Sequence, residues 1–259
     1  MGCVLLALLG SATAATAASL SKRSANSTGP LLTIHEDATK ILMISAREHR
    51  VYSRWDKTHH RALSPYGRAM ADAVRAHLRK SQQKARVLML GLGGGVIAGD
   101  LLCNQASLPA GIGRITAVEA YASVAKLAET RFFGAMFAGP CASMRDRLRV
   151  VVGDAMTGGL QAFEGRSFFS SVLVDVPAAY ESAEGAPTAF YAGLLALCAP
   201  GGLLVLNTLY EKQMEVQAVQ AKLHDAGWRN ISAQLVETAG NRLAKWRPRA
   251  NVIVVAVRE

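Results

Sequence analysis

The sequence predicts an α/β protein with a Rossmann-like, doubly wound and mostly parallel sheet, preceded by a small N-terminal β-hairpin. One observation is an apolar run, Val87–Leu90, that stops at a glycine-rich turn, residues 91–95, before an apolar helix-like run begins at Val96. A second is the alternation of strand-like and helix-like segments from residue 86 onward, which is typical of parallel sheets covered by helices. A third is that acidic residues stand where several of these strands end, the position at which such sheets bind ligands.

The overall composition fits one globular domain with modest additions. The chain has 259 residues, of which 51% are hydrophobic and 19% charged, enough to bury a full core. Its 29 Lys and Arg residues exceed the 19 Asp and Glu residues, so the formal net charge is +10 and acidic partners are favoured. Because the basic residues are spread along the chain, a solvated basic surface is the favoured interpretation, and binding to nucleic acid, an anionic membrane or an acidic protein is the alternative.

The N-terminal segment has the character of a leader. The first eighteen residues carry no charged side chain, and an apolar run, Cys3–Leu9, is followed by small residues at 12–17 that suit a cleavage site. Residues 1–18 are therefore predicted to be a secretory signal peptide, which places the protein in the secretory pathway or outside the cell. An organellar transit peptide is the alternative, because no acidic residue precedes Glu36. Residues 19–30 follow as an exposed linker.

The cysteines offer no support for an oxidising compartment. Beyond Cys3 the chain has three, an odd number at unrelated spacings: Cys103, Cys141 and Cys198. We therefore expect no disulfide framework. Cys198 lies in an apolar predicted helix, where a buried thiol is the usual state of a cysteine.

The small hairpin and the helix after it come first in chain order. Strand-like stretches at Lys40–Ser45 and Arg50–Ser53 predict the hairpin, within an N-terminal segment of residues 31–62. A helix is expected over Ser64–Lys80, because a serine cap and a proline in the first turn open it. The ligand-binding domain is expected to occupy residues 63–259.

From residue 86 the expected strands and helices alternate. The strands are residues 87–90, 114–119, 148–152, 172–175 and 203–208. The helices are residues 96–102, 122–132, 188–198 and 211–226. Two late strands, residues 232–236 and 252–257, should close the sheet in antiparallel orientation.

The glycine-rich turn is the candidate cofactor-binding loop. Gly91, Gly93 and Gly95 form a G-x-G-x-G pattern in which Gly94 fills an intervening position. Glycines there permit positive φ angles and the close approach of a ligand to backbone N–H groups at a helix start. From Gly93 to Ala98 the segment also fits G-x-G-x-x-A, so a nicotinamide dinucleotide is an alternative ligand.

Acidic residues at the strand ends are the other candidate site residues. Glu119 ends the second strand, where its carboxylate can accept both hydrogen bonds from a ribose diol. Asp154 ends the third, where it can accept from an adenine amino group while the backbone N–H of Ala155 binds a ring nitrogen. Asp175 ends the fourth strand beside the reactive end of the ligand, so it is the catalytic candidate.

Four further stretches carry a family resemblance: AVEA at 117–120, RVVVGDA at 149–155, VLVD at 172–175 and APGG at 199–202. With these and the glycine loop, residues 86–208 resemble the spermidine-synthase-like branch of class I S-adenosylmethionine-dependent transferases. The N-terminal hairpin is similar to that family's small β-domain. The resemblance implies a fold of the class I methyltransferase type, S-adenosylmethionine as cofactor, a small-molecule or protein acceptor, and a homodimer as a common assembly.

The chain departs from the family where polyamine chemistry would lie. Polyamine aminopropyltransferases carry an aspartate in the loop where this chain has Gly94, and a second acid three residues after Asp175, where it has Ala178. Their tyrosine-glutamine-glutamate cluster is reduced here to Tyr66-Gly67-Arg68. A diamine needs carboxylates to hold its ammonium groups, since burying an unpaired cation is costly. We therefore expect a methyltransferase of this type with an unknown acceptor; aminopropyl transfer and a non-catalytic binding protein that retains the fold are the alternatives.

A few other residues could contribute to a lid, a metal site or an anion site. Tyr52, Trp55, His59 and His60 are candidates for a lid over the ligand. The histidines show no metal-ligand spacing, so no metal is expected. A basic segment around Trp246 could meet an anionic substrate or nucleic acid, although a solvated hairpin tip is the favoured interpretation.

Overall fold

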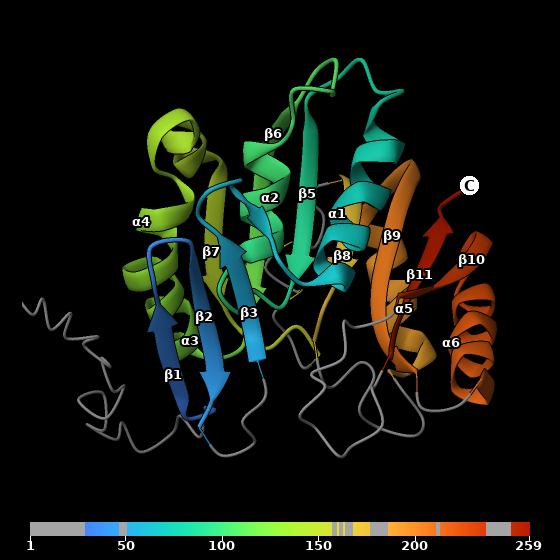
Figure 1. Cartoon of the computed structure of the whole chain (residues 1–259). Coiled ribbons are helices and arrows are strands. Elements are labelled where there is room, and N and C mark those ends of the chain that lie inside the picture. Colours follow the sequence, from blue (N-terminus) through green and yellow to red (C-terminus); the bar gives the residue numbers. More distant parts are fainter. Residues whose placement is uncertain are drawn as a thin grey trace, which may run out of the picture.

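The computed structural model describes residues 29–46, 51–156, 160, 163, 168–176, 186–210, 213–236 and 250–259. These residues form two sheets, a small antiparallel sheet near the N-terminus and a seven-stranded sheet with helices on both faces (Figure 1). The predicted leader, most of the predicted linker and the basic segment around Trp246 lie outside the described residues.

The small sheet has four strands where the sequence predicted a two-stranded hairpin. In chain order they are β1 (Leu32–Glu36), β2 (Lys40–Ser45), β3 (Val51–Asp56) and β4 (Arg61–Ala62), and they lie side by side in that order. The predicted pair corresponds to β2 and β3. A tight turn folds β1 onto β2, because the Asp37 carboxylate accepts hydrogen bonds from the backbone N–H groups of Thr39 and Lys40 at 2.8 and 2.9 Å.

The large sheet confirms the predicted Rossmann-like, mostly parallel architecture. Its strands lie in the order β10-β11-β9-β8-β5-β6-β7. In chain order they are β5 (Ala85–Leu90), β6 (Ile112–Glu119), β7 (Leu148–Val152), β8 (Phe169–Val174), β9 (Cys198–Tyr210), β10 (Arg229–Val236) and β11 (Ala250–Val257). Strands β5 to β9 are parallel, and β11 pairs antiparallel with both β9 and β10, as expected for the two late strands.

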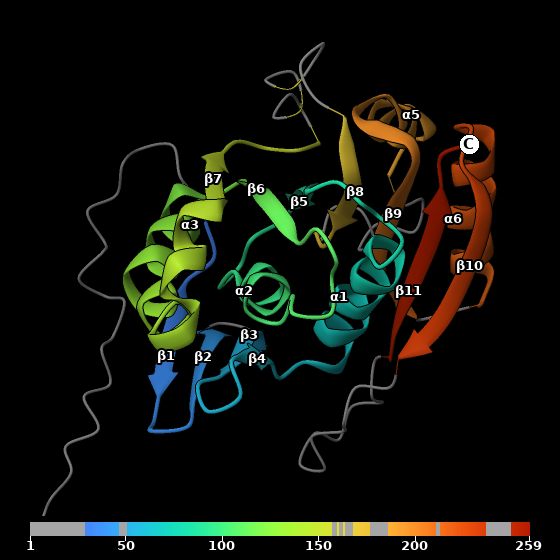
Figure 2. The same cartoon turned by 90° about the horizontal axis from the view of Figure 1, so that it is seen from above.

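Helices cover both faces of the large sheet, so the chain is doubly wound. They are α1 (Pro65–Leu78), α2 (Val96–Cys103), α3 (Ala122–Leu127), α4 (Phe133–Met136), α5 (Thr188–Leu197) and α6 (Gln213–Asp225). A π-helical turn, Ala128–Phe132, joins α3 to α4. Seen from above, α2 lies between the large and small sheets, and α5 lies across the large sheet from it (Figure 2).

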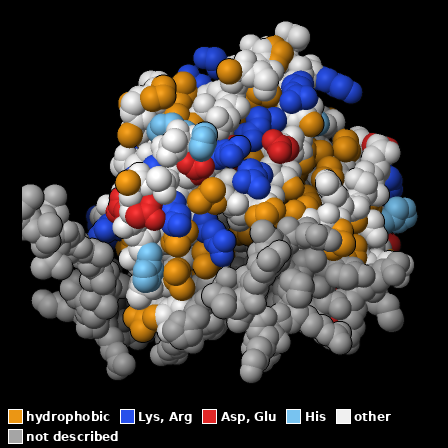
Figure 3. All heavy atoms as spheres, viewed as in Figure 1, with side chains coloured by type: hydrophobic (Ala, Val, Ile, Leu, Met, Phe, Trp, Pro, Cys, Tyr) orange, Lys and Arg blue, Asp and Glu red, His pale blue; other side chains and the backbone are white. Residues whose placement is uncertain are grey.

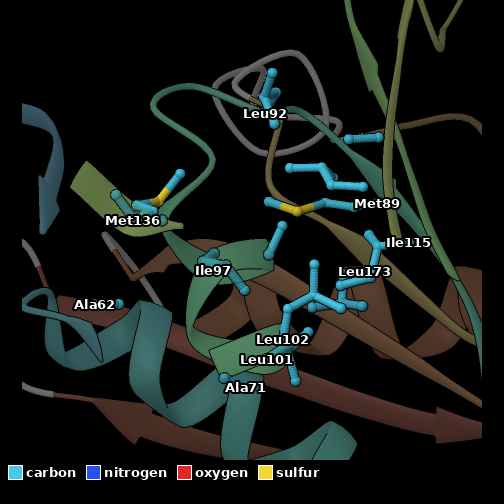
Figure 4. Packing of buried hydrophobic residues seen from close by; sticks show 14 of the residues in the cluster. Ala62, Ala71, Met89, Leu92, Ile97, Leu101, Leu102, Ile115, Met136 and Leu173 are labelled. Atoms are coloured by element: carbon cyan, nitrogen blue, oxygen red, sulfur yellow. The ribbon is translucent and has the colours of Figure 1, made fainter. Parts of the chain in front are cut away.

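Alternate residues of the central strands divide between two apolar cores. On β8, Leu173 belongs to the core beneath α1, α2 and the small sheet, whereas Val172 and Val174 belong to the core beneath α5 and α6. Strands that are apolar on both faces are expected where helices cover both sides of a parallel sheet. Figure 4 shows the first core, in which Met89 and Leu173 lie on the face of the large sheet that α2 covers, together with Ile97 of α2.

A buried ion pair fastens the small sheet to the helices. Asp100 of α2 is only 1% exposed. Its carboxylate accepts hydrogen bonds from the guanidinium of Arg75 in α1 at 2.9 Å and from the backbone N–H of Ala62 in β4 at 2.8 Å. Burial raises the pKa of the Asp100 carboxyl, although the nearby positive charge of Arg75 acts to lower it. One carboxylate therefore joins α1, α2 and β4.

Two of the cysteines form a disulfide, although their number and spacing predicted no disulfide framework. Cys103, at the end of α2, is bonded to Cys141, and their Cα atoms are 5.4 Å apart, within the ordinary range for a disulfide. The two are separated by 38 positions in the sequence, and only the packing of the 3₁₀ segment Gly139–Arg147 near α2 brings them together. Cys198 is a buried free thiol, as expected, and burial raises its pKa to about 12.

The surface carries charges of both signs. On the face shown in Figure 3, Lys and Arg side chains are interspersed with Asp, Glu and His side chains. Among the helices that the structure describes, none is both long and apolar enough to span a membrane.

Candidate cofactor and active site

The strand order brings the predicted site residues into one row along an edge of the large sheet. Asp154 follows β7, Glu119 ends β6, the glycine loop follows β5, and Asp175 follows β8. Since β7, β6, β5 and β8 are neighbours in that order and parallel, their carboxyl ends meet at the same edge. The chain winds away from β5 in both directions, and such a switch point is where open α/β sheets bind ligands.

The glycine loop takes a conformation that requires glycine for reasons internal to the protein. Gly91, Gly93 and Gly95 have φ angles of +85°, +53° and +75°. A Cβ atom on Gly94 would lie 2.9 Å from both the Phe132 ring and the Ser53 side chain. A larger residue at these positions would therefore disturb the loop even without a ligand.

Every backbone N–H group of the loop, residues 91–95, already has an acceptor in the protein. Gly91 donates to Val118 O, Leu92 and Gly93 to Glu119 Oε2, Gly94 to Ser53 Oγ, and Gly95 to Leu92 O, at 2.8–3.2 Å. The loop therefore does not present the open N–H donors expected from the sequence. A ligand would meet it by close approach to the glycine Cα atoms, or by replacing an acceptor.

Glu119 is buried against the loop and already accepts three hydrogen bonds. Oε2 accepts from the N–H groups of Leu92 and Gly93 at 3.1 and 3.2 Å, and Oε1 accepts from that of Tyr121 at 3.0 Å. A carboxylate has about four acceptor positions. To hold both hydroxyls of a ribose, as the sequence predicts, Glu119 would have to release one of these three N–H groups, two of which belong to the loop. Ligand binding and loop geometry are therefore coupled through this side chain.

Asp154 and Ala155 lie beside Glu119 at the end of β7. The backbone N–H of Gly153 donates to the backbone carbonyl of Glu119 at 2.9 Å, which ties the two strand ends together. Asp154 is exposed, and its Oδ1 accepts from the N–H of Met156 at 2.9 Å, an arrangement that fixes the turn. Ala155 is buried. The adenine contacts assigned to this pair remain predictions.

Asp175 stands at the end of β8 and is held from the neighbouring strand. The side-chain amide of Asn207 in β9 donates to Asp175 Oδ1 at 2.8 Å. Gly91 packs directly against the Asp175 backbone, since a Cβ on Gly91 would overlap the Asp175 carbonyl oxygen. The catalytic candidate thus lies against the start of the glycine loop. Asn207 was not predicted as a site residue. The one feature of the sequence that could have identified it is that it is a polar residue within an apolar strand.

Ser53 is a second residue that the sequence analysis missed. It lies on β3 of the small sheet, is buried, and its hydroxyl oxygen accepts the Gly94 N–H hydrogen bond at 2.8 Å. The small sheet therefore helps to shape the cofactor loop. No local pattern identifies such a serine, because its partner is 41 residues away in the chain.

Replacing Ser53 with alanine should lower the free energy of unfolding by about 1–3 kcal/mol, because the buried Gly94 N–H would lose its acceptor. Urea unfolding measures this change. The matched control is Thr33→Ala in β1 of the same sheet, where a partly exposed hydroxyl makes a bond of 3.4 Å. It should change stability by less than about 0.5 kcal/mol. Equal effects of the two substitutions would show that the Ser53–Gly94 bond does not stabilise the loop.

The lid proposed from the sequence does not include Trp55. That side chain is fully buried, and its ring packs against Gly99 of α2. His59 is exposed and pairs with Asp56 at 2.8 Å. Among the described residues, no group of three His, Cys, Asp or Glu side chains could hold a metal ion. Ala178, where the second acid of aminopropyltransferases would stand, lies outside the described residues.

Several solved structures of other proteins share this architecture. A probable spermidine synthase from Corynebacterium glutamicum superposes with a TM-score of 0.63 at 18% identity, over 89% of this chain and 78% of the other. Spermidine synthase from Thermotoga maritima gives 0.62 at 12%, over 88% and 69%. Magnesium protoporphyrin IX methyltransferase from Synechocystis, solved with bound S-adenosylmethionine, gives 0.51 at 16%, over 75% and 80%. The chain has the fold of spermidine synthases and S-adenosylmethionine-dependent methyltransferases.

The three neighbours named here are two spermidine synthases and a methyltransferase, and another solved structure with this fold is a [4+2]-cyclase. At identities of 12–18% the likeness defines the fold, and the activity has to be argued from the site. No protein-family model and no curated protein sequence matches the chain. The Rossmann-like domain was correctly predicted from the sequence, and the small β-hairpin predicted ahead of it is part of a four-stranded sheet.

Proposed function

We propose that this protein is an S-adenosylmethionine-dependent methyltransferase of the spermidine-synthase-like type. The proposal is supported by the row of site residues at the switch point: Glu119 beside the glycine loop, Asp154 on one side and Asp175 on the other. In this assignment Glu119 would bind the ribose, Asp154 and the Ala155 N–H the adenine, and the glycines would admit the methionine portion. The acceptor would be a small molecule or a protein.

The observation that favours methyl over aminopropyl transfer is the packing around Gly94. Aminopropyltransferases are expected to carry an aspartate here, but Phe132 and Ser53 fill the space that its side chain would need. The loop is therefore built for a residue without a side chain. A site that lacks this carboxylate is poorly suited to an ammonium-bearing acceptor.

The chemistry asks little of the protein beyond placement and handling of one proton. S-adenosylmethionine, when bound, supplies an already activated methyl group on a sulfonium. The protein then has to hold the acceptor in line with that methyl, and positioning alone can supply several kcal/mol of the rate enhancement. Asp175, fixed by Asn207, would orient the acceptor or remove its proton.

Calorimetry with S-adenosylhomocysteine on the purified protein tests the cofactor assignment. Saturable binding at micromolar concentrations is expected. No binding at high micromolar ligand would contradict the proposal. A parallel titration with NAD distinguishes the dinucleotide alternative: binding of NAD in place of S-adenosylhomocysteine would assign the loop to a nicotinamide enzyme.

Aminopropyl transfer is the second candidate, because the chain keeps an acid at Asp175, although it has Gly94 where the loop aspartate of aminopropyltransferases would stand. Formation of spermidine from putrescine and decarboxylated S-adenosylmethionine would reverse our ranking. A non-catalytic protein that retains the fold is the third. Cofactor binding without any methylated product over a broad acceptor panel would favour it.

Asp175→Asn should separate catalysis from cofactor binding. Asp175 lies beyond the loop from Glu119, so affinity for S-adenosylhomocysteine should stay within about threefold, a change below ~1 kcal/mol. Methyl transfer to an acceptor found in the panel should fall about a hundredfold or more if the carboxylate is a general base. Calorimetry and turnover of the same preparations measure both. Equal loss of both would assign Asp175 to the cofactor site.

The proposed location is the secretory pathway, with an organelle as the alternative. The leader-like composition of residues 1–18 motivates it, and the Cys103–Cys141 disulfide is of the kind that persists in oxidising compartments. Mass spectrometry of the protein from its native source tests the proposal. A mature chain that begins near residue 19 and carries this disulfide would support it, whereas an intact N-terminus with two free thiols would contradict it.

A further inference from the structure

Three polar side chains on adjacent strands form a chain that ends at the catalytic candidate. The side-chain amide of Asn251 in β11 donates to Asn207 Oδ1 at 2.8 Å, and the amide of Asn207 in β9 donates to Asp175 Oδ1 at 2.8 Å. Asn207 and Asn251 are 2% and 6% exposed. We call these two residues the amide pair.

The strand register explains why the three side chains meet. Val174 of β8 is paired with Leu206 of β9, so the next residues, Asp175 and Asn207, lie side by side. β11 runs antiparallel to β9 with Ile253 opposite Asn207, which places Asn251 diagonally next to Asn207 on the same face. Leu173 and Ile253, on that face, belong to the core beneath α1 and α2. The amide pair thus lies at the rim of this core, along the carboxyl edge of the sheet.

The direction of the hydrogen bonds is fixed by the chemistry of the two ends. An ionised carboxylate only accepts, so Asn207 must present its NH₂ group to Asp175. Its carbonyl oxygen then points to the other side, where the NH₂ group of Asn251 satisfies it. Asn251 strengthens this preference, because an Asn207 amide that turned over would place its oxygen against the carboxylate and its NH₂ group against the NH₂ group of Asn251.

A buried amide in an apolar setting is costly unless its polar atoms are hydrogen-bonded. The neighbours of the amide pair on β9 and β11, Val205, Leu206, Ile253 and Val254, are apolar and almost fully buried. Apolar residues in place of buried polar groups are often neutral or stabilising. The amide pair instead leads to the carboxylate that stands beside the glycine loop.

We propose that Asn207 and Asn251 are positioning residues, which hold the Asp175 carboxylate ionised and in a fixed orientation for the acceptor. Asn207 stabilises the ionised form directly, because it donates a hydrogen bond to it. Asn251 acts one step away, by reinforcing the orientation in which the Asn207 NH₂ group faces Asp175. The role in methyl transfer rests on the proposed function, whereas the control of the carboxylate does not.

The experiment is a carboxyl-¹³C NMR titration of Asp175 in the ligand-free protein, with the resonance assigned from Asp175→Asn. Asn207→Ala should raise the midpoint by about one pH unit, and Asn251→Ala by a smaller amount in the same direction. Asn207→Asp, which keeps the shape but adds a like charge, should raise the midpoint more than Asn207→Ala does. A role limited to packing would not produce this order.

Ser171→Ala is the matched control. Ser171 is fully buried on β8, four residues before Asp175 and on the same face, and its hydroxyl has no hydrogen-bond partner among the described residues. This variant should leave the Asp175 midpoint unchanged. A shift as large as that of Asn207→Ala would mean that any buried change on β8 or β9 moves the carboxylate, and would overturn the proposal.

A reciprocal measurement covers the case in which an Asn207 variant does not fold. In Asp175→Ala, the side-chain NH₂ resonances of Asn207 should shift strongly and those of Asn251 weakly, because the first bond of the chain is lost. Unchanged resonances, or an unchanged midpoint in Asn207→Ala, would overturn the proposal. Since no cofactor is present, these outcomes are distinct from a failure of S-adenosylhomocysteine to bind, which would contradict the proposed function instead.

Discussion

Asp100→Ala is expected to lower the free energy of unfolding by about 3–5 kcal/mol, the usual cost of removing one partner of a buried ion pair. Asp100 is 1% exposed and accepts hydrogen bonds from Arg75 and from the Ala62 N–H. Without it, the charge of Arg75 is left largely buried and the N–H of β4 loses its acceptor. The small sheet should loosen from α1 and α2, and urea unfolding measures the loss.

Asp72→Ala provides the matched control, because Asp72 pairs with the same guanidinium at 3.1 Å but is 70% exposed. Exposed pairs contribute roughly 0–1 kcal/mol, so this variant should be close to the wild type. If the two variants were equally unstable, loss of any acid paired with Arg75 would have the same effect, and the burial of the Asp100 pair would not explain its contribution to stability.

The pH dependence of the Asp100 contribution follows from the direction of its pKa shift. Burial raises the pKa of this carboxyl above the ordinary value of 3.8. A raised pKa means that the folded protein binds the proton more tightly than the unfolded chain does. The contribution to stability is therefore fully present below pH 3.8 and declines as the pH rises through the folded pKa. The stability difference between the wild type and Asp100→Asn should change in this direction between low and neutral pH.

The large sheet was predictable because its signals are local. Each central strand is a short apolar run, and each ends at a glycine or an acid that also marks the site, as in Leu90–Gly91 and Val118–Glu119. Strands β1 and β4 of the small sheet were harder to predict, since β4 has only two residues and β1 carries only two buried apolar residues. Length and periodicity are the signals that such strands lack.

The contacts that shape the site could not be read from the sequence, because they join residues far apart in the chain. Ser53 reaches Gly94 across 41 positions, and Asn207 reaches Asp175 across 32. The Cys103–Cys141 bond spans 38. A serine, an asparagine or a cysteine has no local pattern that names its partner. Strand order and packing decide these pairs, and both emerge only when the sheet has formed.

Glu119→Ala is expected to weaken binding of S-adenosylhomocysteine by more than about a hundredfold. The variant would lose the charge-assisted hydrogen bond between the carboxylate and the ribose, worth ~1.5–3 kcal/mol. It would also leave the N–H groups of Leu92, Gly93 and Tyr121 without the acceptor that now fixes them. Both effects act against the ligand, because the loop that should admit the methionine portion is held by the side chain that should bind the ribose.

A second substitution of Glu119 identifies which effect dominates, and a substitution of Glu129 is the control. Glu129→Ala removes an exposed acid from the π-helical turn and should leave affinity unchanged. Glu119→Gln keeps the shape and one acceptor oxygen, but it turns an NH₂ group toward backbone donors that need acceptors. If the loop dominates, Glu119→Gln should bind almost as weakly as Glu119→Ala. If the ribose bond dominates, Gln should recover part of the affinity, because its oxygen can still accept from one hydroxyl. Full affinity in folded Glu119→Ala would show that Glu119 does not bind the ribose and that the cofactor does not bind at this edge of the sheet.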